Sequence, residues 1–445
     1  MQRDHDFSQG SIAKNITVMA VPMIIAQVMN VLYNITDRFF IGRIGGGESL
    51  SLTGVGIVFP IITIITAFTN LFGMGGAPLC SIARGRKDEV LAEQIIGSSF
   101  FMLVITALIL TFIGVVFQNP LLRLFGASSE VFPYAKDYFS VYIWGTAASV
   151  IGLGMNNFIN CQGFGKVGMV SIAAGAVINV ILDPLLIFVL DLGVRGAAIA
   201  TVVAQLVSAV WVLHFLTGRK ALLLLRKEHI RWQPAVLLQT VQVGFANFVM
   251  AFTNGITQFV YNRALMNLGG DVFVGAMTVI TSVREMVIMP VHGITAGSQP
   301  VLGYNYGAQK LDRVKKGIAF TTGVCIVYTA VAWAVLFLFP QAAILLFTDD
   351  PKLLEVGVDM LHVYFGGFCL MALQFSGQAT FTALGKAKYA IFFSLFRKVV
   401  LVIPLIWLLP RYMGVSGVFW SEPISNLIGG GACFATMLWM VKKKL

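Results

Sequence analysis

Long apolar runs recur along the chain, and they constrain its fold more than any other feature. Each is long enough to cross the roughly 30 Å hydrocarbon layer of a bilayer as a helix. The runs cover residues 14–44, 51–81, 93–117, 133–160, 167–191, 194–217, 235–267, 272–303, 316–340, 354–382, 387–409 and 415–440. Lipid-embedded backbone needs helices or closed barrels, and these runs are too long for barrel strands. The sequence predicts an all-α integral membrane protein with twelve transmembrane helices.

Composition agrees with a lipid environment. Only 11% of the 445 residues are charged, 57% are hydrophobic, and the mean hydropathy is +0.84. The net charge of +11 does not indicate nucleic-acid binding, because the basic residues form short clusters between apolar runs. The five cysteines show no CxxC spacing, so neither a disulfide framework nor a zinc site is predicted. We expect no nucleic-acid partner and no cofactor other than a coupling ion.

The basic residues also predict the orientation of the chain in the membrane. Lys and Arg are concentrated in the loops 84–87, 219–231 and 310–316, whereas the loops on the opposite side are much poorer in them. Cytoplasmic loops carry the excess of Lys and Arg. Both termini fall on the richer side, and residues 1–15 lack the order of a cleavable signal. We expect a monomeric, multi-pass protein of the cytoplasmic (inner) membrane with both termini in the cytoplasm.

The two halves of the chain resemble each other. Matching features recur at offsets of 220 to 224 residues, and their order is kept. They are FGK (164–166) with LGK (384–386), Pro184 with Pro404, GVRG (193–196) with GVSG (414–417), Pro78 with Pro300, Gly85 with Gly307, and GG (45–46) with GG (269–270). This repeat predicts two pseudo-symmetric six-helix bundles, related by an axis along the membrane normal. The predicted domains are an N-terminal lobe (1–217), a cytoplasmic linker (218–234) and a C-terminal lobe (235–445).

Polar residues within the first-half runs indicate a site. Asp37, Asp183 and Thr201 each lie seven residues from the outer end of a run, about 10 Å deep at 1.5 Å per residue. Asn179 precedes Asp183 by one helical turn and shares its face. Such oxygen ligands suit Na⁺, or a proton shared between carboxylates. The alternative is that Asp37 lies at the interface and that Asp183 only bonds Asn179.

The second half carries a different set of polar residues. Glu422 corresponds to Thr201 at an offset of 221, and Glu285 lies beside Arg284 at a depth comparable to that of Arg397 and Lys398. A charge-paired cluster with a structural role is favoured over a second coupling site. Amides at helical spacing, among them Gln258, either line a cavity or bond helices together.

The chain resembles the multidrug and toxic-compound extrusion (MATE) family over essentially its whole length. The matching features are Pro22, Asp37, NVILDP at 179–184, Thr201, and the two turns GGAPLCSIARGRKDE (75–89) and GSQPVLGYNYGAQKLDR (297–313). The resemblance implies a two-lobed transporter, not an enzyme, that exports amphipathic, often cationic drugs in exchange for Na⁺ or H⁺.

The resemblance also implies which residues bind. Asp37, Asn179, Asp183 and Thr201 match the cation site of the N-terminal lobe, holding Na⁺ if the coupling is to sodium. By the same resemblance, Pro22, Tyr33 and Asn156 are expected near that site. Gln258 and Glu285, polar residues of the second-half runs, are further candidates for the substrate cavity.

One alternative function stays open. A flippase of lipid-linked precursors has a related two-lobe architecture, and it needs a cationic central cavity for a diphosphate headgroup. The candidates for such a cavity are Arg284, Arg397 and Lys398.

Overall fold

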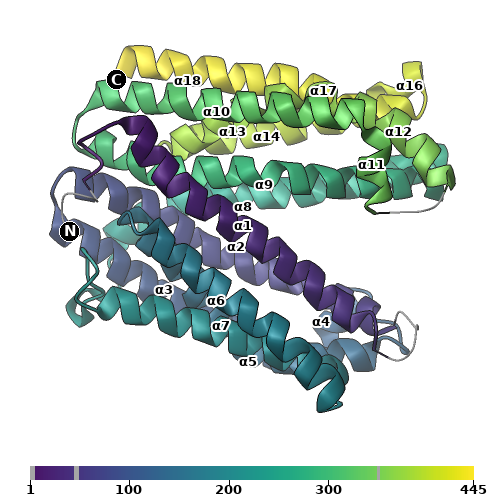
Figure 1. Ribbon diagram of the computed structural model, residues 1–445, viewed down its shortest axis with the longest axis horizontal. Coiled ribbons are helices and arrows are strands. Elements are labelled where there is room, and N and C mark those ends of the chain that lie inside the picture. Colours follow the sequence, from purple (N-terminus) through teal and green to yellow (C-terminus); the bar gives the residue numbers. More distant parts are fainter. Residues whose placement is uncertain (1–5, 45–49, 348–350, 445) are drawn as a thin grey trace. The chain divides into compact units, whose positions relative to one another are not determined.

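The computed structural model describes residues 6–44, 50–347 and 351–444, apart from the side chains of Asn34, Asp271 and Lys444. The described residues form helices and no strand (Figure 1). The first half contains α1 (Ile12–Ile41), α2 (Leu50–Gly85), α3 (Glu89–Val116), α4 (Gln118–Leu124), α5 (Phe132–Cys161), α6 (Gly165–Pro184), η2 (Leu185–Val189), α7 (Gly193–Thr217) and η3 (Lys227–His229). The second half contains α8 (Pro234–Gly269), α9 (Asp271–Gly307), α10 (Leu311–Leu338), α11 (Pro340–Leu345), α12 (Pro351–Phe365), α13 (Phe368–Ala383), α14 (Ala387–Leu395), η4 (Phe396–Val402), α15 (Ile403–Leu408), α16 (Pro410–Met413), α17 (Ser416–Ser425), η5 (Asn426–Gly430) and α18 (Gly431–Lys444).

The described helices confirm the predicted number of membrane spans. Eleven segments are each long and apolar enough to cross a bilayer, and α12 with α13 makes a twelfth span that is bent by 50°. The sequence predicted one run there, 354–382. The bend falls at Gly366 and Gly367, where a Cβ on Gly367 would lie 3.0 Å from the backbone of Pro423 in α17. The close approach of α17 therefore favours glycine at the break.

Prolines lie beside two stretches of wider helical winding. Pro184 ends α6 and is followed by the π-helical segment η2, in which the amide of Leu190 donates to the carbonyl of Leu185. In the second half, Pro404 follows the π-helical segment η4. Proline has no N–H and clashes with the carbonyl of the preceding turn, so irregular helical winding is common beside it.

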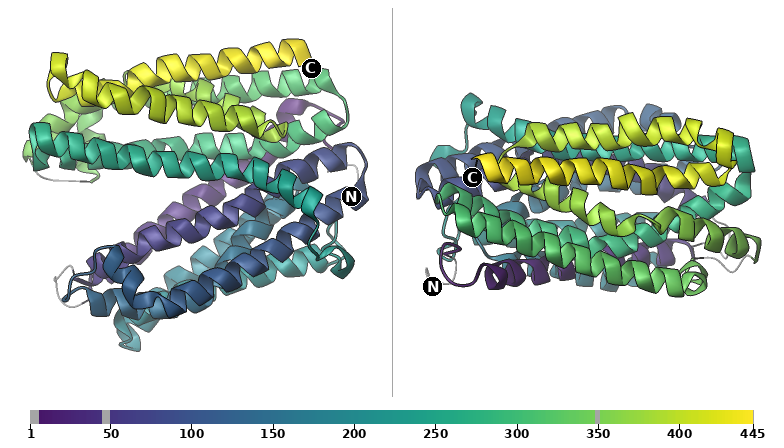
Figure 2. Two further views of the ribbon diagram at one scale, coloured as in Figure 1. Left: turned by 180° about the vertical axis from the view of Figure 1, so that it is seen from behind. Right: turned by 90° about the horizontal axis from the view of Figure 1, so that it is seen from above.

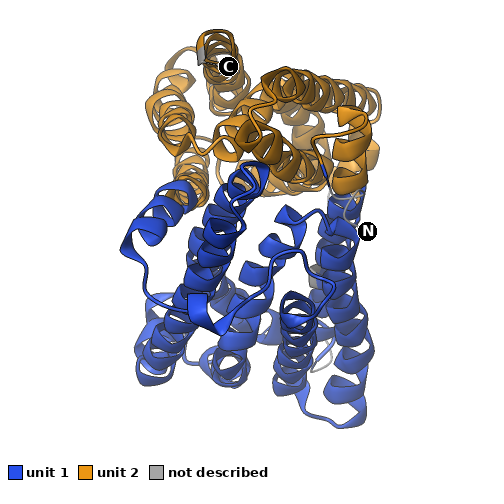
Figure 3. Cartoon of the chain, turned by 90° about the vertical axis from the view of Figure 1, so that its left-hand side faces the viewer, with its two compact units in different colours: residues 1–6, 21–244 blue, residues 7–20, 245–445 orange. Residues whose placement is uncertain are grey.

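The chain divides into two compact units, shown in blue and orange in Figure 3. The first consists of residues 1–6 and 21–244, and the second of residues 7–20 and 245–445. The division passes through α1, so its first turns pack with the second half of the sequence. Each unit has its own apolar core, with Phe139 and Phe158 fully buried in the first and Phe365 and Phe419 in the second.

The expected linker, 218–234, lies in the first unit and is bonded to it. The amide of Leu223 donates to Gln162 Oε1 at 2.9 Å, and the amide of Leu224 donates to Glu93 Oε1 at 3.2 Å. Arg226 pairs with the other oxygen of Glu93 at 2.9 Å. This segment is therefore fastened to α3 and α5.

Within the second unit, α13 packs against α9, α10, α14 and α18, and the views of Figure 2 show these helices together. The N-terminal segment is fastened to the same unit. Arg313 donates to the carbonyls of Phe7, Gln9 and Gly10 at 2.7 to 3.0 Å, and Asn305 donates to that of Phe7 at 3.0 Å.

Turns with positive φ recur in both halves and support the repeat. Lys87 and Gln309, Gly163 and Gly385, and Gly193 and Gly414 all have φ between 52° and 95°. The offsets are 309 − 87 = 222, 385 − 163 = 222 and 414 − 193 = 221. In the structure, Gly385 corresponds to the turn glycine Gly163. The sequence match of FGK with LGK instead pairs Gly385 with Gly165, so that match is displaced by two residues.

Candidate functional site

A cavity of about 280 Å³ lies inside the first unit, among α1, α2, α5, α6 and α7. Apolar residues such as Phe59, Ile62 and Ile172 cover part of its wall. The polar lining residues are Asn30, Tyr33, Asp37, Thr66, Tyr138, Tyr142, Ser149, Asn156, Ser171, Thr201, Gln205 and Ser208. A concave site that combines apolar wall residues with convergent polar groups is typical of small-molecule binding.

Asn179, Asp183 and Thr201 form a buried hydrogen-bonded group at this cavity. Asn179 Nδ2 donates to Asp183 Oδ1 at 3.2 Å and lies 3.5 Å from Thr201 Oγ1, so α6 and α7 meet here. All three side chains are at most 1% exposed. Thr201 lines the cavity, whereas Asn179 and Asp183 are not among the lining residues. Thr201 thus connects the cavity to the Asp183 carboxyl group.

Asp37 reaches the same cavity from α1. It is 3% exposed and lines the cavity. The neighbouring Arg38 instead places its guanidinium carbon 4.4 Å from the centre of the Phe59 ring. The ion pairs of the described chain include neither carboxylate of this site. The structure thus places Asp37 on the wall of the same cavity that Thr201 lines.

Three buried oxygens at this site have no hydrogen-bond partner in the described part of the protein. They are Asp37 Oδ1, Asn179 Oδ1 and Asp183 Oδ2. Buried polar atoms are nearly always hydrogen-bonded, so each of these oxygens calls for a bound ion, a proton or water. Hard oxygen ligands fit Na⁺ or a proton rather than a transition metal.

Aromatic side chains surround the acids, and sequence reasoning named only Tyr33 among them. The rings of Tyr138 and Tyr142 stack with centroids 6.0 Å apart, and Gln205 donates to the Tyr142 hydroxyl at 3.4 Å. Tyr33, Tyr138 and Thr201 all line the cavity. The missed signal was helical spacing: Tyr138 precedes Tyr142 by four residues, and Gln205 follows Thr201 by four.

Asn156 lies on the cavity wall, but Pro22 does not line it. Asn156 Nδ2 donates to the carbonyl of Gly168 at 3.3 Å, and its Oδ1 has no partner in the described structure. Nearby, Ser208 donates to the carbonyl of Ser171 at 2.5 Å, which joins α7 to α6. Pro22 is buried in α1, the helix that carries Asp37, but it is not among the residues that line the cavity.

Gln258 and Glu285 belong to the second unit and not to this cavity. Gln258 donates to Asn262 on the same helix at 3.2 Å. Glu285 is 57% exposed and pairs with Arg284 at 2.5 Å.

The charges of the second unit centre on Glu422. Arg397 donates to Glu422 Oε1 at 3.0 Å, Lys398 lies 3.5 Å from both carboxylate oxygens, and Arg284 lies at 3.9 Å. Tyr261 adds a hydrogen bond to Glu422 Oε2 at 3.3 Å. The predicted cluster therefore exists, and its buried acid is Glu422 rather than Glu285.

Comparison with known proteins identifies the family. The sequence model of the MatE family matches residues 22–185 and, again, residues 245–408. The two matches are 245 − 22 = 223 residues apart, which is the spacing of the internal repeat.

Curated relatives match over nearly the whole chain. The multidrug export protein MepA of Staphylococcus haemolyticus is 26% identical over 424 residues, which are 95% of this chain and 92% of that protein. MepA of Staphylococcus aureus strain MRSA252 is 24% identical over 94% of this chain and 92% of its own length.

Solved structures show the same fold. A MATE transporter crystallised in a bent conformation superimposes with a TM-score of 0.92 at 22% identity, covering 97% of this chain and 96% of that one. A transporter of the MOP superfamily from Pyrococcus furiosus, whose binding pocket has reversed polarity, gives a TM-score of 0.91 at 21% identity over 98% and 97%. The chain therefore belongs to the MatE family of multi-pass membrane transporters, the multidrug and toxic-compound extrusion family, and is a transporter rather than an enzyme.

Proposed function

We propose that this protein exports amphipathic, often cationic small molecules in exchange for inward-moving Na⁺ or H⁺. The observation that carries the proposal is the pair of buried carboxyl groups, Asp37 and Asp183, each with an unpartnered oxygen beside the cavity of the first unit. A buried carboxylate without a partner is unfavourable in lipid-embedded protein, so it favours binding of an external positive charge. The MepA relatives are multidrug export proteins, which supports the same substrate class.

Competition for the two carboxylates supplies the exchange. A coupling ion neutralises Asp37 and Asp183, with Asn179 and Thr201 as further oxygen ligands, and so removes the charge that holds a cationic substrate. The substrate body packs against the aromatic and aliphatic wall that includes Phe59, Tyr138 and Ile172. Exchange results when ion and substrate favour different conformations of the protein. Each charge that crosses 100 mV contributes about 2.3 kcal/mol, which for a neutral substrate exchanged against one ion is a concentration ratio of about 50.

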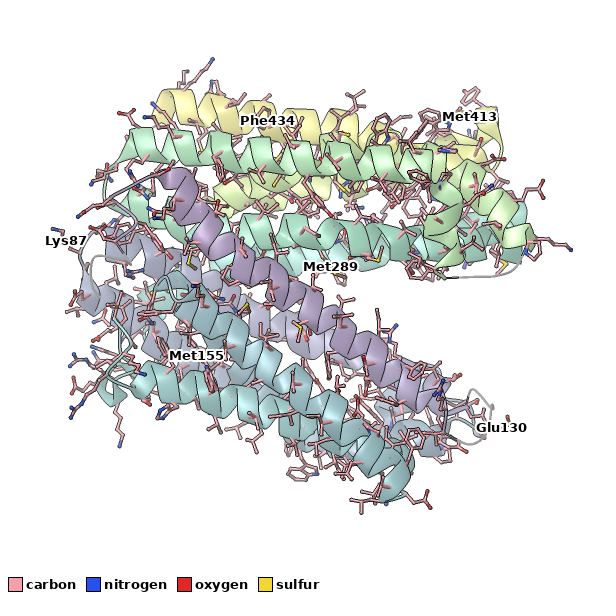
Figure 4. The ribbon with its side chains drawn as sticks, viewed as in Figure 1. Lys87, Glu130, Met155, Met289, Met413 and Phe434 are labelled. Carbon is pink, nitrogen blue, oxygen red and sulfur yellow. The ribbon has the colours of Figure 1, made fainter. Side chains whose placement is uncertain are left out.

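The proposed orientation places the basic ends of the helices in the cytoplasm. In the first unit, Lys87 and Glu130 mark opposite ends of the bundle (Figure 4). Lys87 follows Arg84 and Arg86 in the turn after α2, so the positive-inside rule assigns that end to the cytoplasm. We place the protein in the cytoplasmic membrane as a monomer with both termini in the cytoplasm.

The flippase alternative receives less support. Its headgroup site requires basic side chains that are free to bind a diphosphate. Arg397 and Lys398 are at most 6% exposed and are bonded to Glu422, and Arg284 is bonded to Glu285. Binding a diphosphate there would require breaking buried ion pairs, which is strongly unfavourable.

Ethidium transport in everted vesicles tests the proposal. Na⁺ and pH gradients are imposed separately on wild type, Asp37→Asn and Asp183→Asn. We expect wild-type transport with one of the gradients and its loss in both variants. Asp137→Asn is the matched control, because Asp137 forms an exposed ion pair with Arg195, a kind that contributes little. Gradient-driven transport that persists in both site variants would exclude the site, and transport that follows neither gradient would exclude antiport.

A further inference from the structure

The buried charged cluster of the second unit has a specific shape. We define it as Arg284, Arg397, Lys398, Glu422 and Asn426. Arg397 Nη1 donates to Glu422 Oε1 at 3.0 Å and to Asn426 Oδ1 at 2.5 Å. Glu422 and Asn426 are each 1% exposed. A carboxylate and an amide thus clasp a guanidinium group inside the helix bundle.

The repeat identifies the counterparts of these residues in the first unit. The turn glycines Gly163 and Gly385 precede helices that begin at Gly165 and Ala387, so the offset is 222 along α6 and α14. Gly196 and Gly417 make equivalent close contacts. A Cβ on Gly196 would lie 2.7 Å from the carbonyl carbon of Leu186, and a Cβ on Gly417 would lie 2.6 Å from that of Leu409. The offset along α7 and α17 is therefore 417 − 196 = 221.

These offsets align the cluster with the wall of the cavity in the first unit. At an offset of 222, Ile62, Gly175 and Ala176 correspond to Arg284, Arg397 and Lys398. At an offset of 221, Thr201 and Gln205 correspond to Glu422 and Asn426. All five first-unit residues line the cavity. Small or apolar wall positions of the first unit are therefore basic residues in the second.

In each unit, one glycine faces a larger residue on the neighbouring helix, but the glycine is on opposite helices in the two units. In the first unit, a Cβ on Gly175 would lie 3.0 Å from Ser208 Oγ, so the glycine is on α6. In the second unit, Gly429 corresponds to Ser208 at an offset of 221, and a Cβ on it would lie 2.9 Å from Arg397 Cγ. The glycine has moved to the opposite helix, where it makes room for the arginine stem. The space of the cavity wall is thus reassigned to the Arg397 side chain.

We infer that the second unit contains a cation-binding site whose ligand is part of the chain. Glu422 and Asn426 are the receptor groups, and the guanidinium of Arg397 with the ammonium of Lys398 is the resident ligand. Removal of the Arg397 side chain leaves a site for a small guanidinium ion, and removal of the Lys398 side chain leaves one for an alkylammonium ion. In the intact protein the resident cations keep this site from exchanging ions, so exchange is confined to the first unit; only this last clause rests on the proposed function.

Chemical rescue tests the inference. Thermal unfolding of purified Arg397→Ala is followed in detergent with increasing methylguanidinium, and wild type is measured in the same series. We expect a lower midpoint for the variant and a rise toward the wild-type value with methylguanidinium but not with Na⁺ or tetramethylammonium. Arg411→Ala, which removes an exposed guanidinium of the same unit, should show no such rise. The double variant Arg397→Ala/Glu422→Gln should lose the rescue because the receptor carboxylate is gone.

A second variant protects the test against misfolding. Lys398 contacts Glu422 only at 3.5 Å, so Lys398→Ala removes less than the arginine variant does, and ethylammonium should restore its midpoint. If neither variant is selectively stabilised by its matching cation, the inference is wrong. Rescue is an equilibrium property that requires no transport. If the matching cations rescue the Arg397 and Lys398 variants but Asp37→Asn still transports ethidium, only the proposed function is rejected. If rescue fails but Asp37→Asn loses transport, only this inference is rejected.

Discussion

The side-chain amide of Asn179 donates to Oδ1 of Asp183 at 3.2 Å, one helical turn along α6. This bond leaves Asp183 Oδ2 and Asn179 Oδ1 unpartnered in the described structure, so both atoms are available to an incoming ion. A fixed amide donor also stabilises the ionised form of the carboxylate, the form that attracts cations. The pair therefore forms the inner wall of the proposed ion site.

Asn179→Ala should weaken Na⁺ binding, because it removes the Oδ1 ligand, and should strengthen H⁺ binding, because it removes the donor that stabilises the ionised Asp183 carboxylate. A hydrogen bond to a charged group is worth about 1.5–3 kcal/mol, or about 10- to 150-fold in proton affinity. Asn179→Asp is the contrasting variant, because it keeps the oxygen but removes the amide donor. The ion concentration that gives half-maximal ethidium exchange measures both. Unchanged half-maximal concentrations would exclude a role for this bond.

Thr201 should act through its hydroxyl. Thr201→Val keeps the shape but removes the oxygen that faces both Asn179 and the cavity, and we expect a loss of about 0.5–1.5 kcal/mol in ion binding. Thr201→Ser keeps the oxygen and should behave like wild type. Ion titrations of the two variants distinguish the hydroxyl from packing, and equal behaviour of the two would contradict the assignment.

Close packing of α2 and α8 should not tolerate a methyl group at Gly244. A Cβ there would overlap the carbonyl of Leu71, and one on Gly75 would overlap that of Thr240. We expect Gly244→Ala to destabilise the protein by about 3 kcal/mol, since the backbones must separate. Gly255→Ala, on the same helix, meets nothing within 4 Å and should stabilise by about 1 kcal/mol through helix propensity. Thermal midpoints in detergent measure both, and similar values would refute the contact.

Glu93 should hold the 218–233 segment against the first unit. Glu93→Ala removes the acceptor of the Leu224 amide and the partner of Arg226, so the segment should open more often. Trypsin should then cleave it roughly tenfold faster, in line with the penalty for an unpaired buried amide. Glu89→Ala, an exposed acid of the same helix, is the control. Equal cleavage rates would show that the segment is already free.

Hydropathy alone was sufficient to predict the helices, because a lipid-embedded backbone leaves so few alternatives. The bend at Gly366 and Gly367 escaped prediction because both flanking helices are apolar, so hydropathy continues across the break. The division of α1 between the units was also hidden, since it depends on which distant helices pack on Ala20 and Val21. Contacts of that kind are not encoded in local periodicity.

The acids of the site were predictable by depth, because Asp37, Asp183 and Thr201 lie equally far from the outer helix ends. Tyr138 and Tyr142 were not, since a tyrosine in an apolar helix is ordinary until the structure shows where its hydroxyl points. Glu422 was aligned with Thr201 from the repeat, but its pairing with Arg397 depends on the close approach of α14–η4 to α17. The roles of the site residues as ion ligands stay a prediction.

The central claim is that a positively charged substrate and the coupling ion compete for Asp37 and Asp183. Equilibrium binding of ethidium to the purified protein, followed by fluorescence anisotropy while Na⁺ or H⁺ is raised at constant ionic strength, tests this most directly. The account predicts that one of the two ions weakens ethidium binding competitively in wild type and in Asp137→Asn, and that Asp37→Asn and Asp183→Asn lose this dependence. Ethidium affinity that is independent of both ions in wild type, or equally ion-dependent in the site variants, would contradict it.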